Sequence, residues 1–264
     1  MVRSLLIRGM LVGAAAGVLA FLFAVLFGEP QVDHAIAFED HLAQLAHEPD
    51  EAPLVSRDLQ STWGLLTGTL VMGVALGGLF SLAYAWAYGR IGNGRLSARA
   101  TAGLLALAAY LTIVIVPFTK YPANPPAVSN DDTIGRRTLL YVVMVIISVV
   151  AAIAAGRIRR SLLPSLGGWN AAIAAFAAFV ATIVVAQLIL PAIDEMPAGF
   201  PADVLYRFRL ASLGTNAVLW LVIGLGFGAA AERLLAPAAT GLGGTRRTRR
   251  AARLASVRDG HEGG

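Results

Sequence analysis

The stretch LLIRGMLVGAAAGVLAFLFAVLF (Leu5–Phe27) decides the fold class, because it runs for 23 residues with a single charge, that of Arg8. About 20 apolar residues are enough to cross the hydrocarbon core of a bilayer as a helix. The run is too long for the apolar part of a signal peptide, and no A-x-A cleavage site follows at Gly28–Pro30. We therefore expect a retained transmembrane helix.

Further apolar stretches extend this reading to the whole chain. They predict five more spans, at about 62–88, 100–119, 138–156, 169–190 and 208–234. The composition agrees, since 57% of the residues are hydrophobic and only 14% are charged, against roughly 25% in soluble domains. The sequence thus predicts an all-α protein. Residues 1–236 form one polytopic transmembrane bundle of about six spans, and residues 237–264 form a disordered basic tail.

Charge is divided unequally between two sets of connecting segments. The N-terminus, residues 89–99, residues 157–168 and the C-terminal segment together hold 15 basic and 3 acidic residues, whereas the other set holds 6 basic and 13 acidic. The positive-inside rule places the basic set in the cytoplasm. We therefore expect a multi-pass protein of the plasma (inner) membrane with both termini cytoplasmic. The net charge of +5 then reflects topology, and we expect no nucleic-acid partner.

Glycines four residues apart recur in three of the predicted spans. Such glycines share one helix face and let two backbones approach closely. A static packing interface is the favoured interpretation, and a moving interface in a transporter is the alternative. The pairs or triplets are Gly9, Gly13 and Gly17; Gly64 and Gly68; Gly73 and Gly77; and Gly224 and Gly228.

Several classes of chemistry are excluded. The chain has no cysteine, which rules out disulfides, thiolate metal sites and cysteine nucleophiles. It also lacks phosphate-binding glycine loops and hydrolase motifs, so we expect neither an enzyme nor a bound cofactor. The predicted spans hold almost no ionisable side chains, their polar candidates being Ser148, Thr182, Gln187 and Asn216. The charged part of any cation site would therefore lie at the outer mouth of the bundle.

Acidic and histidine side chains gather in the outer segments. Residues 31–46 have helical periodicity and follow Pro30, a good residue for a first helical turn. Imidazole and carboxylate together suit Co²⁺, Ni²⁺, Zn²⁺ or Fe²⁺. No H-x₃-H or E-x-x-H spacing occurs, however, so the metal signal is weak and spacing alone favours a solvated acidic loop. The candidate ligands are Glu29, Asp33, His34 and Glu39 in the first outer segment, Asn124 in the second, and Asp194 and Glu195 in the third.

Prolines and arginines surround the later candidates. Asn124 stands among Pro122, Pro125 and Pro126, and prolines also restrict the backbone around Asp194 and Glu195. Nearby arginines are candidate partners of these carboxylates or of Asp131 and Asp132, and pairing would lower the value of the carboxylates as ligands. The arginines concerned are Arg136, Arg137, Arg207 and Arg209.

The same segments carry a resemblance to a known family. Over about Leu5–Leu235 the chain resembles the CbtA family of predicted cobalt transporter subunits. Four stretches carry the resemblance: Arg8–Met10 with Phe27–Asp33 and Ala35–Glu39; Val55–Asp58 with Gln60–Thr62; Pro117–Phe118 with Lys120–Pro126; and Asp194–Glu195 with Pro197–Ala202, continuing to Phe208–Arg209.

The resemblance implies an inner-membrane protein for cobalt uptake, with a divalent cation as the transported ligand. It also implies a small, histidine-rich, single-span partner of the CbtB kind, and a homo-oligomer is a further candidate assembly. The family is usually described with about five spans, one fewer than predicted here. The main alternative is a non-transporting scaffold or accessory subunit, which the scarcity of polar residues within the spans favours. A membrane enzyme is the third and weakest interpretation.

Overall fold

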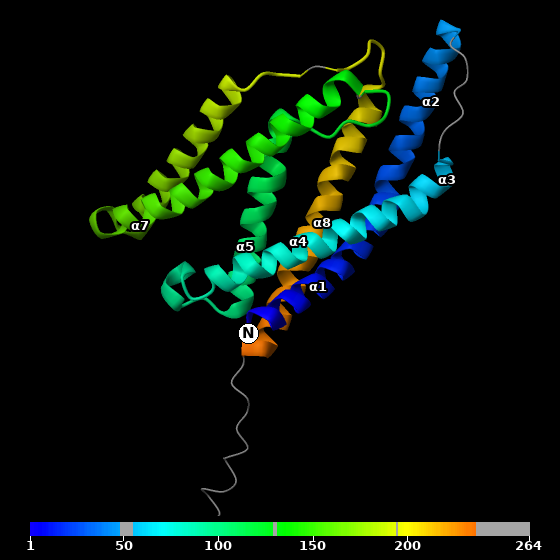
Figure 1. Cartoon of the computed structure of the whole chain (residues 1–264). Coiled ribbons are helices and arrows are strands. Elements are labelled where there is room, and N and C mark those ends of the chain that lie inside the picture. The colour runs from blue at the N-terminus through cyan, green and yellow to red at the C-terminus, as the bar shows by residue number, and fades with distance from the viewer. Residues whose placement is uncertain (48–54, 129–130, 194, 236–264) are drawn as a thin grey trace, which may run out of the picture.

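The computed structural model describes residues 1–47, 55–128, 131–193 and 195–235, and these residues form helices with no strand among them (Figure 1). The predicted tail, 237–264, lies outside the described residues, so its predicted disorder stays a prediction. The helices are α1 (Val2–Phe23), η1 (Ala24–Gly28), α2 (Glu29–Ala46), α3 (Arg57–Leu59), η2 (Gln60–Gly64), α4 (Leu65–Ala87), η3 (Ile91–Gly94), α5 (Ala98–Ala109), η4 (Tyr110–Ile115), α6 (Val116–Lys120), α7 (Asp131–Ile189) and α8 (Ala202–Leu235).

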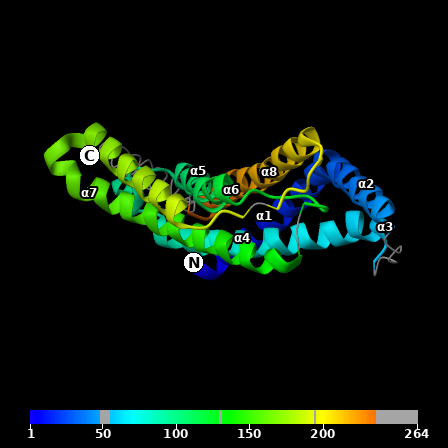
Figure 2. The ribbon, with the colours of Figure 1, turned by 90° about the horizontal axis from the view of Figure 1, so that it is seen from above.

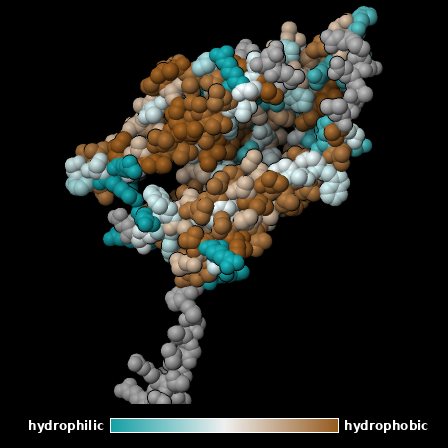
Figure 3. Space-filling view, in the orientation of Figure 1, coloured by the Kyte–Doolittle hydropathy of each residue, from teal (hydrophilic) through white to brown (hydrophobic). Residues whose placement is uncertain are grey.

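Five continuous helical segments are long and apolar enough to cross a membrane. They are Val2–Ala46, Arg57–Ala87, Ala98–Lys120, Thr133–Ile189 and Ala202–Leu235, and they cover the predicted spans to within one residue. Figure 3 shows broad hydrophobic surfaces over the helix flanks, with hydrophilic groups gathered toward the ends. The all-helical, multi-pass fold predicted from the sequence is confirmed, whereas the count of six spans is not.

The first segment is longer than a membrane requires. Its 45 residues correspond to about 68 Å of helix, more than twice the roughly 30 Å of a hydrocarbon core. The helix predicted over 31–46 is present as α2, but it continues α1 instead of following a loop. Pro30 has no backbone N–H, and the wider π turn η1 directly before it lets the chain continue without a break.

α7 consists of two arms that fold back on each other (Figures 1 and 2). Gly167 divides them, since its φ of 72° and ψ of 172° are not helical, and the left-handed φ suits glycine. The predicted spans 138–156 and 169–190 fall in different arms. Met144 from the first arm and Ile183 from the second lie in one buried cluster, so the arms pack side by side.

The main core lies between α1, α4, α5 and α8. Phe80 and Tyr84 of α4 pack edge-on against Phe227 of α8, with ring centroids 5.4 and 5.0 Å apart. Trp220 extends the same cluster along α8, and Ala102 adds the contribution of α5. Aromatic rings packed edge to face fill the space that the small residues of α1 and α5 leave open.

The glycines of the predicted GxxxG pairs differ in what they contact. Gly9, Gly13 and Gly17 of α1 face α4, where a Cβ added at Gly13 would overlap with the carbonyl oxygen of Gly73. The tight approach requires glycine on both helices, as expected for GxxxG packing. Gly68 lies on the same helix as Gly73, yet a Cβ there would meet nothing within 4 Å. The Gly64/Gly68 pair therefore takes no part in the interface that the sequence pattern suggested.

This difference makes a direct test of the α1–α4 interface. We expect Gly13→Ala to lower the free energy of unfolding by about 1–3 kcal/mol, because the backbones must separate to admit a methyl group. Gly68→Ala is the matched control and should leave stability unchanged or raise it by up to about 1 kcal/mol. Denaturant unfolding in detergent micelles, followed by tryptophan fluorescence, measures both. Equal effects would contradict the glycine contact.

Candidate functional site

Three segments far apart in the sequence meet at one end of the molecule, at the upper end in Figure 1. Ala35 of α2, Val128 of the segment 121–128 and Phe200 of the segment 195–201 belong to one buried apolar cluster with the start of α8. Phe38 of α2 contacts Phe200 edge-on, with ring centroids 5.1 Å apart. We call this end, formed by α2, 121–128 and 195–201, the acidic end.

The opposite end gathers arginines. Arg8 donates to the carbonyl oxygen of Ala230 at 3.1 Å, and Arg99 pairs with Glu232 at 2.6 Å. Arg160, close to the turn of α7, donates to the carbonyl oxygen of Arg90 at 2.7 Å. The two ends thus carry opposite kinds of charge, as the counts of charged residues in the connecting segments predict.

A first carboxylate cluster lies at the base of α2. The Arg57 guanidinium pairs with Glu29 and also donates to Asp33 Oδ1, with Nε 3.2 Å and Nη2 3.1 Å from that oxygen. The Glu29 side chain is 16% exposed and that of Asp33 is 64% exposed. His34 and Glu39 are exposed elsewhere on α2. The structure therefore joins two of the four candidates of α2 and neutralises part of their charge.

The second cluster surrounds Glu195, whose side chain is only 3% exposed. Arg137 Nη1 lies 3.2 Å from Glu195 Oε2, and Asn124 Nδ2 donates to the same oxygen at 3.4 Å. The Thr133 hydroxyl donates to Glu195 Oε1. Asn124 and Glu195 are thus brought together from different segments, while Asp194 lies outside the described residues.

A second arginine, Arg209, contacts the side-chain amide of Asn124 and not the carboxylate of Glu195. Arg209 donates to Asn124 Oδ1 at 3.0 Å and to the carbonyl oxygen of Ala123 at 3.3 Å. Because the Asn124 oxygen accepts from Arg209, its NH₂ group is directed at Glu195. Tyr121 closes the cluster by donating its hydroxyl to the carbonyl oxygen of Pro191 at 2.8 Å. Burial raises the pKa of Tyr121, and the nearby Arg136 lowers it by less, so this hydroxyl keeps its proton at neutral pH.

Two cavities adjoin the Glu195 cluster. The outer pocket, of about 40 Å³, is bordered by Lys120, Asn124, Glu195 and Arg209. The inner cavity, of about 280 Å³, is bordered by Thr138, Tyr141, Ser212 and Asn216. Tyr121, Pro122 and Arg137 line both, so the two cavities are neighbours. The larger cavity is mostly apolar, with polar side chains of α7 and α8 along part of its border, and three basic side chains border the smaller one beside Glu195.

Hydroxyl groups of α7 donate hydrogen bonds to backbone carbonyl oxygens of the π turn η4. Ser148 donates to the carbonyl oxygen of Thr112, and the Tyr141 hydroxyl donates to that of Ile113 at 3.0 Å. The i→i+5 pattern of a π turn disturbs the regular helical ladder, and a membrane offers no water to compensate. Ser148, one of the four polar side chains within the predicted spans, thus has a structural partner. Gln187 likewise donates to the Thr119 hydroxyl at 2.6 Å.

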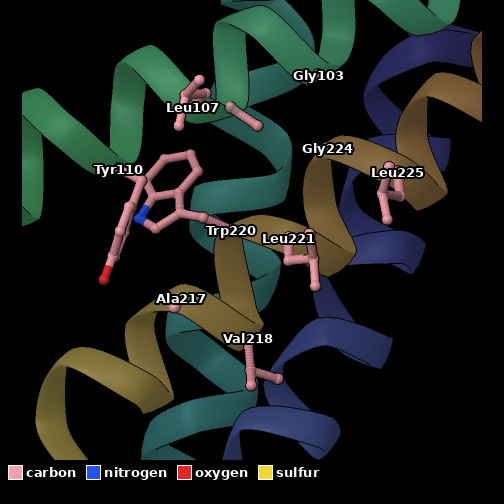
Figure 4. Close-up of a pocket in the computed structure, with 10 residues that line it drawn as sticks. Gly103, Leu107, Tyr110, Ala217, Val218, Trp220, Leu221, Gly224 and Leu225 are labelled. Atoms are coloured by element: carbon pink, nitrogen blue, oxygen red, sulfur yellow. The ribbon is translucent and has the colours of Figure 1, made fainter. Parts of the chain in front are cut away.

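A third cavity, of about 350 Å³, is apolar and lies between α5 and α8 (Figure 4). Leu107, Trp220 and Leu221 line it, together with the ring of Tyr110. The Tyr110 hydroxyl is already used, since it donates to the carbonyl oxygen of Leu213 at 3.2 Å. A cavity without ligand atoms cannot hold a desolvated cation, so its size does not make it the functional site.

The seven candidate ligands therefore fall into separate groups. Glu29 with Asp33, and Asn124 with Glu195, are the two groups that the structure brings together, while His34 and Glu39 stand apart. Within the described residues, no three His, Asp or Glu side chains converge in the way a metal ion requires. A metal site made of these seven residues stays a prediction. Sequence reasoning missed Thr133, which shows no motif and is identified only by its contact with Glu195.

The fold and the two ends define an all-helical, multi-pass membrane protein with a buried, arginine-paired carboxylate at one end. The chain belongs to the CbtA family, because the family model described as "Probable cobalt transporter subunit (CbtA)" matches residues 2–232. No curated protein and no solved structure matches the chain. The resemblance inferred from the sequence motifs is thus confirmed, and the family is one of transporter subunits.

The apolar cluster of the acidic end can be tested by truncation. Phe200→Ala should lower the free energy of unfolding by about 3 kcal/mol, because Phe200 is buried between α2, Val128 and α8. Phe176→Ala is the matched control: Phe176 is 68% exposed on α7, and its loss should cost much less. Both variants are compared with the wild type by unfolding in detergent micelles. A similar loss for both would mean that the cluster does not hold the three segments together.

Proposed function

We propose that this chain is the membrane subunit of a divalent-cation uptake system in the plasma membrane, with cobalt as its cargo. The cation enters at the acidic end, reaches Glu195 and passes into the inner cavity. One observation carries the proposal: a carboxylate that is 3% exposed borders a small pocket, and its partner Arg137 also borders a larger cavity that Asn216 lines. Buried charges of this kind are costly and in membrane proteins commonly mark ion pathways.

The surroundings of Glu195 can supply further oxygen ligands. Thr133 Oγ1 contacts Glu195, and the carbonyl oxygen of Pro122 accepts from Arg137. Asn124 Oδ1 lies nearby and accepts from Arg209 in the described structure. Such a set suits a divalent cation of the first transition row less well than one with imidazole. Weak ligation, however, is compatible with transport, in which the ion must also leave. Asp194 remains a candidate ligand next to Glu195.

α2 supplies the attraction at longer range. Asp33, His34 and Glu39 are exposed on it, and unpaired carboxylates there raise the local concentration of cations. Glu29 and Asp33, although paired with Arg57, form the inner part of this surface. Once a dication has entered, an inside-negative potential favours its passage by about 4.6 kcal/mol per 100 mV, twice the value for a single charge.

The proposed topology has six spans with both termini in the cytoplasm. Each arm of α7 would form one span, because 57 helical residues would measure about 85 Å as a single rod. Gly167, at the turn, and the arginines of the end opposite the acidic end would then face the cytoplasm. The partner would be a small single-span, histidine-rich protein of the CbtB kind, and a homo-oligomer is a further proposal.

A specific observation favours a second function, that of an accessory subunit, which is also a proposal. The described residues show no cluster of three metal-binding side chains, and most of the polar groups within the helices donate to backbone carbonyls. Both features favour an accessory subunit that stabilises a transporting partner. Transport by the isolated chain separates the two functions.

The topology is testable with single cysteines, because the native chain has none. Ser165→Cys, near the turn of α7, should react with a membrane-impermeant maleimide only when the cytoplasmic face is accessible. Ala198→Cys, at the acidic end, should react in intact cells. Labelling of Ser165→Cys from outside would overturn the proposed orientation.

Transport is tested with purified protein in liposomes that contain a cobalt-sensitive dye and carry an inside-negative potential. Glu195→Gln should reduce the initial rate of Co²⁺ entry by at least about tenfold, because the variant keeps the shape of the side chain and removes its charge. Glu39→Gln should have a smaller effect that fades at high salt, since screening weakens attraction at long range.

The control is Asp203→Asn, which removes an exposed carboxylate from the first turn of α8 at the same end. It should leave the rate nearly unchanged. If the wild type itself shows no Co²⁺ entry above empty liposomes, the accessory function replaces the transport function. If Glu195→Gln transports like the wild type, the pathway does not pass Glu195.

A further inference from the structure

The apolar cavity between α5 and α8 opens on the outer surface of the helix bundle (Figure 4). Leu107 of α5 is 54% exposed at its border, and Leu221 and Leu225 of α8 are 60% and 64% exposed. A Cβ added at Gly224 would lie 2.7 Å from the Cβ of Ala106, so the two helices are in contact where these residues line the cavity. The cavity is therefore a lateral groove that faces the hydrocarbon of a surrounding bilayer.

The chemistry of the lining suits a hydrocarbon occupant. The lining surface is almost wholly apolar, and the Tyr110 hydroxyl at its edge already donates to the carbonyl oxygen of Leu213. Apolar cavities stay dry, because water finds no hydrogen-bond partners in them. A groove of this kind inside a membrane is therefore filled by apolar chains.

The dimensions of the groove favour a single lipid chain over a helix. Its lining residues on α8 run from Ala217 to Leu225, which corresponds to about 12 Å of helix. A transmembrane helix is about 10–12 Å wide, and such a length of it occupies far more than the 350 Å³ of the cavity. An acyl chain is narrow enough to lie along the groove.

Arginines lie close to one end of the groove. Arg99, in the first turn of α5, precedes Gly103 by four residues, so it lies on the same helix face and about 6 Å nearer to the end opposite the acidic end. Its side chain is 63% exposed, and its Nε pairs with Glu232 of α8. A guanidinium has five N–H donors, and the described contact of Arg99 uses one of them. Arg95, just before α5, is exposed as well.

We propose that the groove between α5 and α8 is a binding site for an anionic phospholipid, with one acyl chain along the groove and the phosphate at Arg99. Basic groups beside a gap between transmembrane helices are typical of sites for anionic lipid headgroups. A zwitterionic headgroup carries its own positive charge, which these arginines repel. The site goes beyond the proposed uptake function and does not depend on it. In the proposed topology the lipid belongs to the cytoplasmic leaflet.

Trp220 provides a reporter inside the groove. It lines the cavity but is only 5% exposed, whereas Trp63, Trp86 and Trp169 are 67%, 65% and 79% exposed. The variant Trp63→Phe/Trp86→Phe/Trp169→Phe therefore keeps one tryptophan, which the general surface of the bilayer hardly reaches. Bromine atoms on an acyl chain quench indole fluorescence on close contact, so quenching of Trp220 reports a chain in the groove.

The experiment places this full-length single-tryptophan protein in phosphatidylcholine vesicles. The vesicles contain a rising mole fraction of either phosphatidylglycerol or phosphatidylcholine with brominated chains. The anionic lipid should reach half of its maximal quenching at about a fivefold lower mole fraction, a typical effect of one arginine on an anionic headgroup.

Two variants test the two parts of the site. A Cβ at Gly103 would meet nothing within 4 Å, so Gly103→Leu adds a side chain that enters the groove without displacing the backbone, and it should reduce quenching by both lipids at least about threefold. Gly68→Leu is the matched control, since Gly68 is equally open but lies on α4. It should quench like the single-tryptophan parent.

The headgroup contact is tested by Arg99→Gln/Glu232→Gln, which removes the ion pair without leaving an unpaired carboxylate. This variant should lose the preference for the anionic lipid and keep the quenching by brominated phosphatidylcholine. Arg159→Gln is its control, because Arg159 is an exposed arginine of α7 near the turn. The control should keep the fivefold preference.

Melting curves in the same vesicles check that each variant is folded. If Gly103→Leu unfolds, the comparison of Arg99→Gln/Glu232→Gln with its parent carries the test. Equal quenching by the two lipids in the parent would overturn the anionic site. Unchanged quenching in Gly103→Leu would place the chain outside the groove. Absence of quenching by either lipid would mean that another occupant, such as a second copy of the chain, covers Trp220, and the proposal would be wrong.

Discussion

Hydrocarbon forms no hydrogen bonds, and this constraint governs the whole molecule. Backbone groups inside a bilayer must find partners within the protein, which favours helices throughout. Where η4 departs from the α-helical ladder, Ser148 and Tyr141 of α7 donate to its carbonyls. The same constraint keeps ionisable groups away from the middle of the helices and gathers them at the two ends, where they meet each other or water.

At the acidic end, the buried carboxylates are paired with arginines. Glu29 and Asp33 meet Arg57, and Glu195 meets Arg137. This pairing lowers the cost of burying the carboxylates. Among the described residues no cluster of three metal-binding side chains is present.

The candidate site could be predicted in part. The proline-rich segments that hold Asn124 and Glu195 are predicted at one end of the molecule, and the structure places them together there. The sequence also indicates that arginines in the same segments are candidate partners of the carboxylates. Which arginine meets which carboxylate could not be predicted, since Arg137 and Glu195 are 58 residues apart. Arg209 shows the difficulty, because its side chain contacts Asn124 rather than a carboxylate. Thr133 belongs to no sequence motif, so its contact with Glu195 could not be predicted.

The sequence by itself determined that the chain is a helical membrane protein, because long uncharged apolar runs have no other stable environment. It also determined which segments share an end, because arginine and carboxylate divide between alternate connections. Only the tertiary structure decided which glycines touch, that α2 continues α1, and that α2, 121–128 and 195–201 close around one apolar cluster. Those outcomes depend on the angles at which helices cross, and residues far apart in the chain set those angles together.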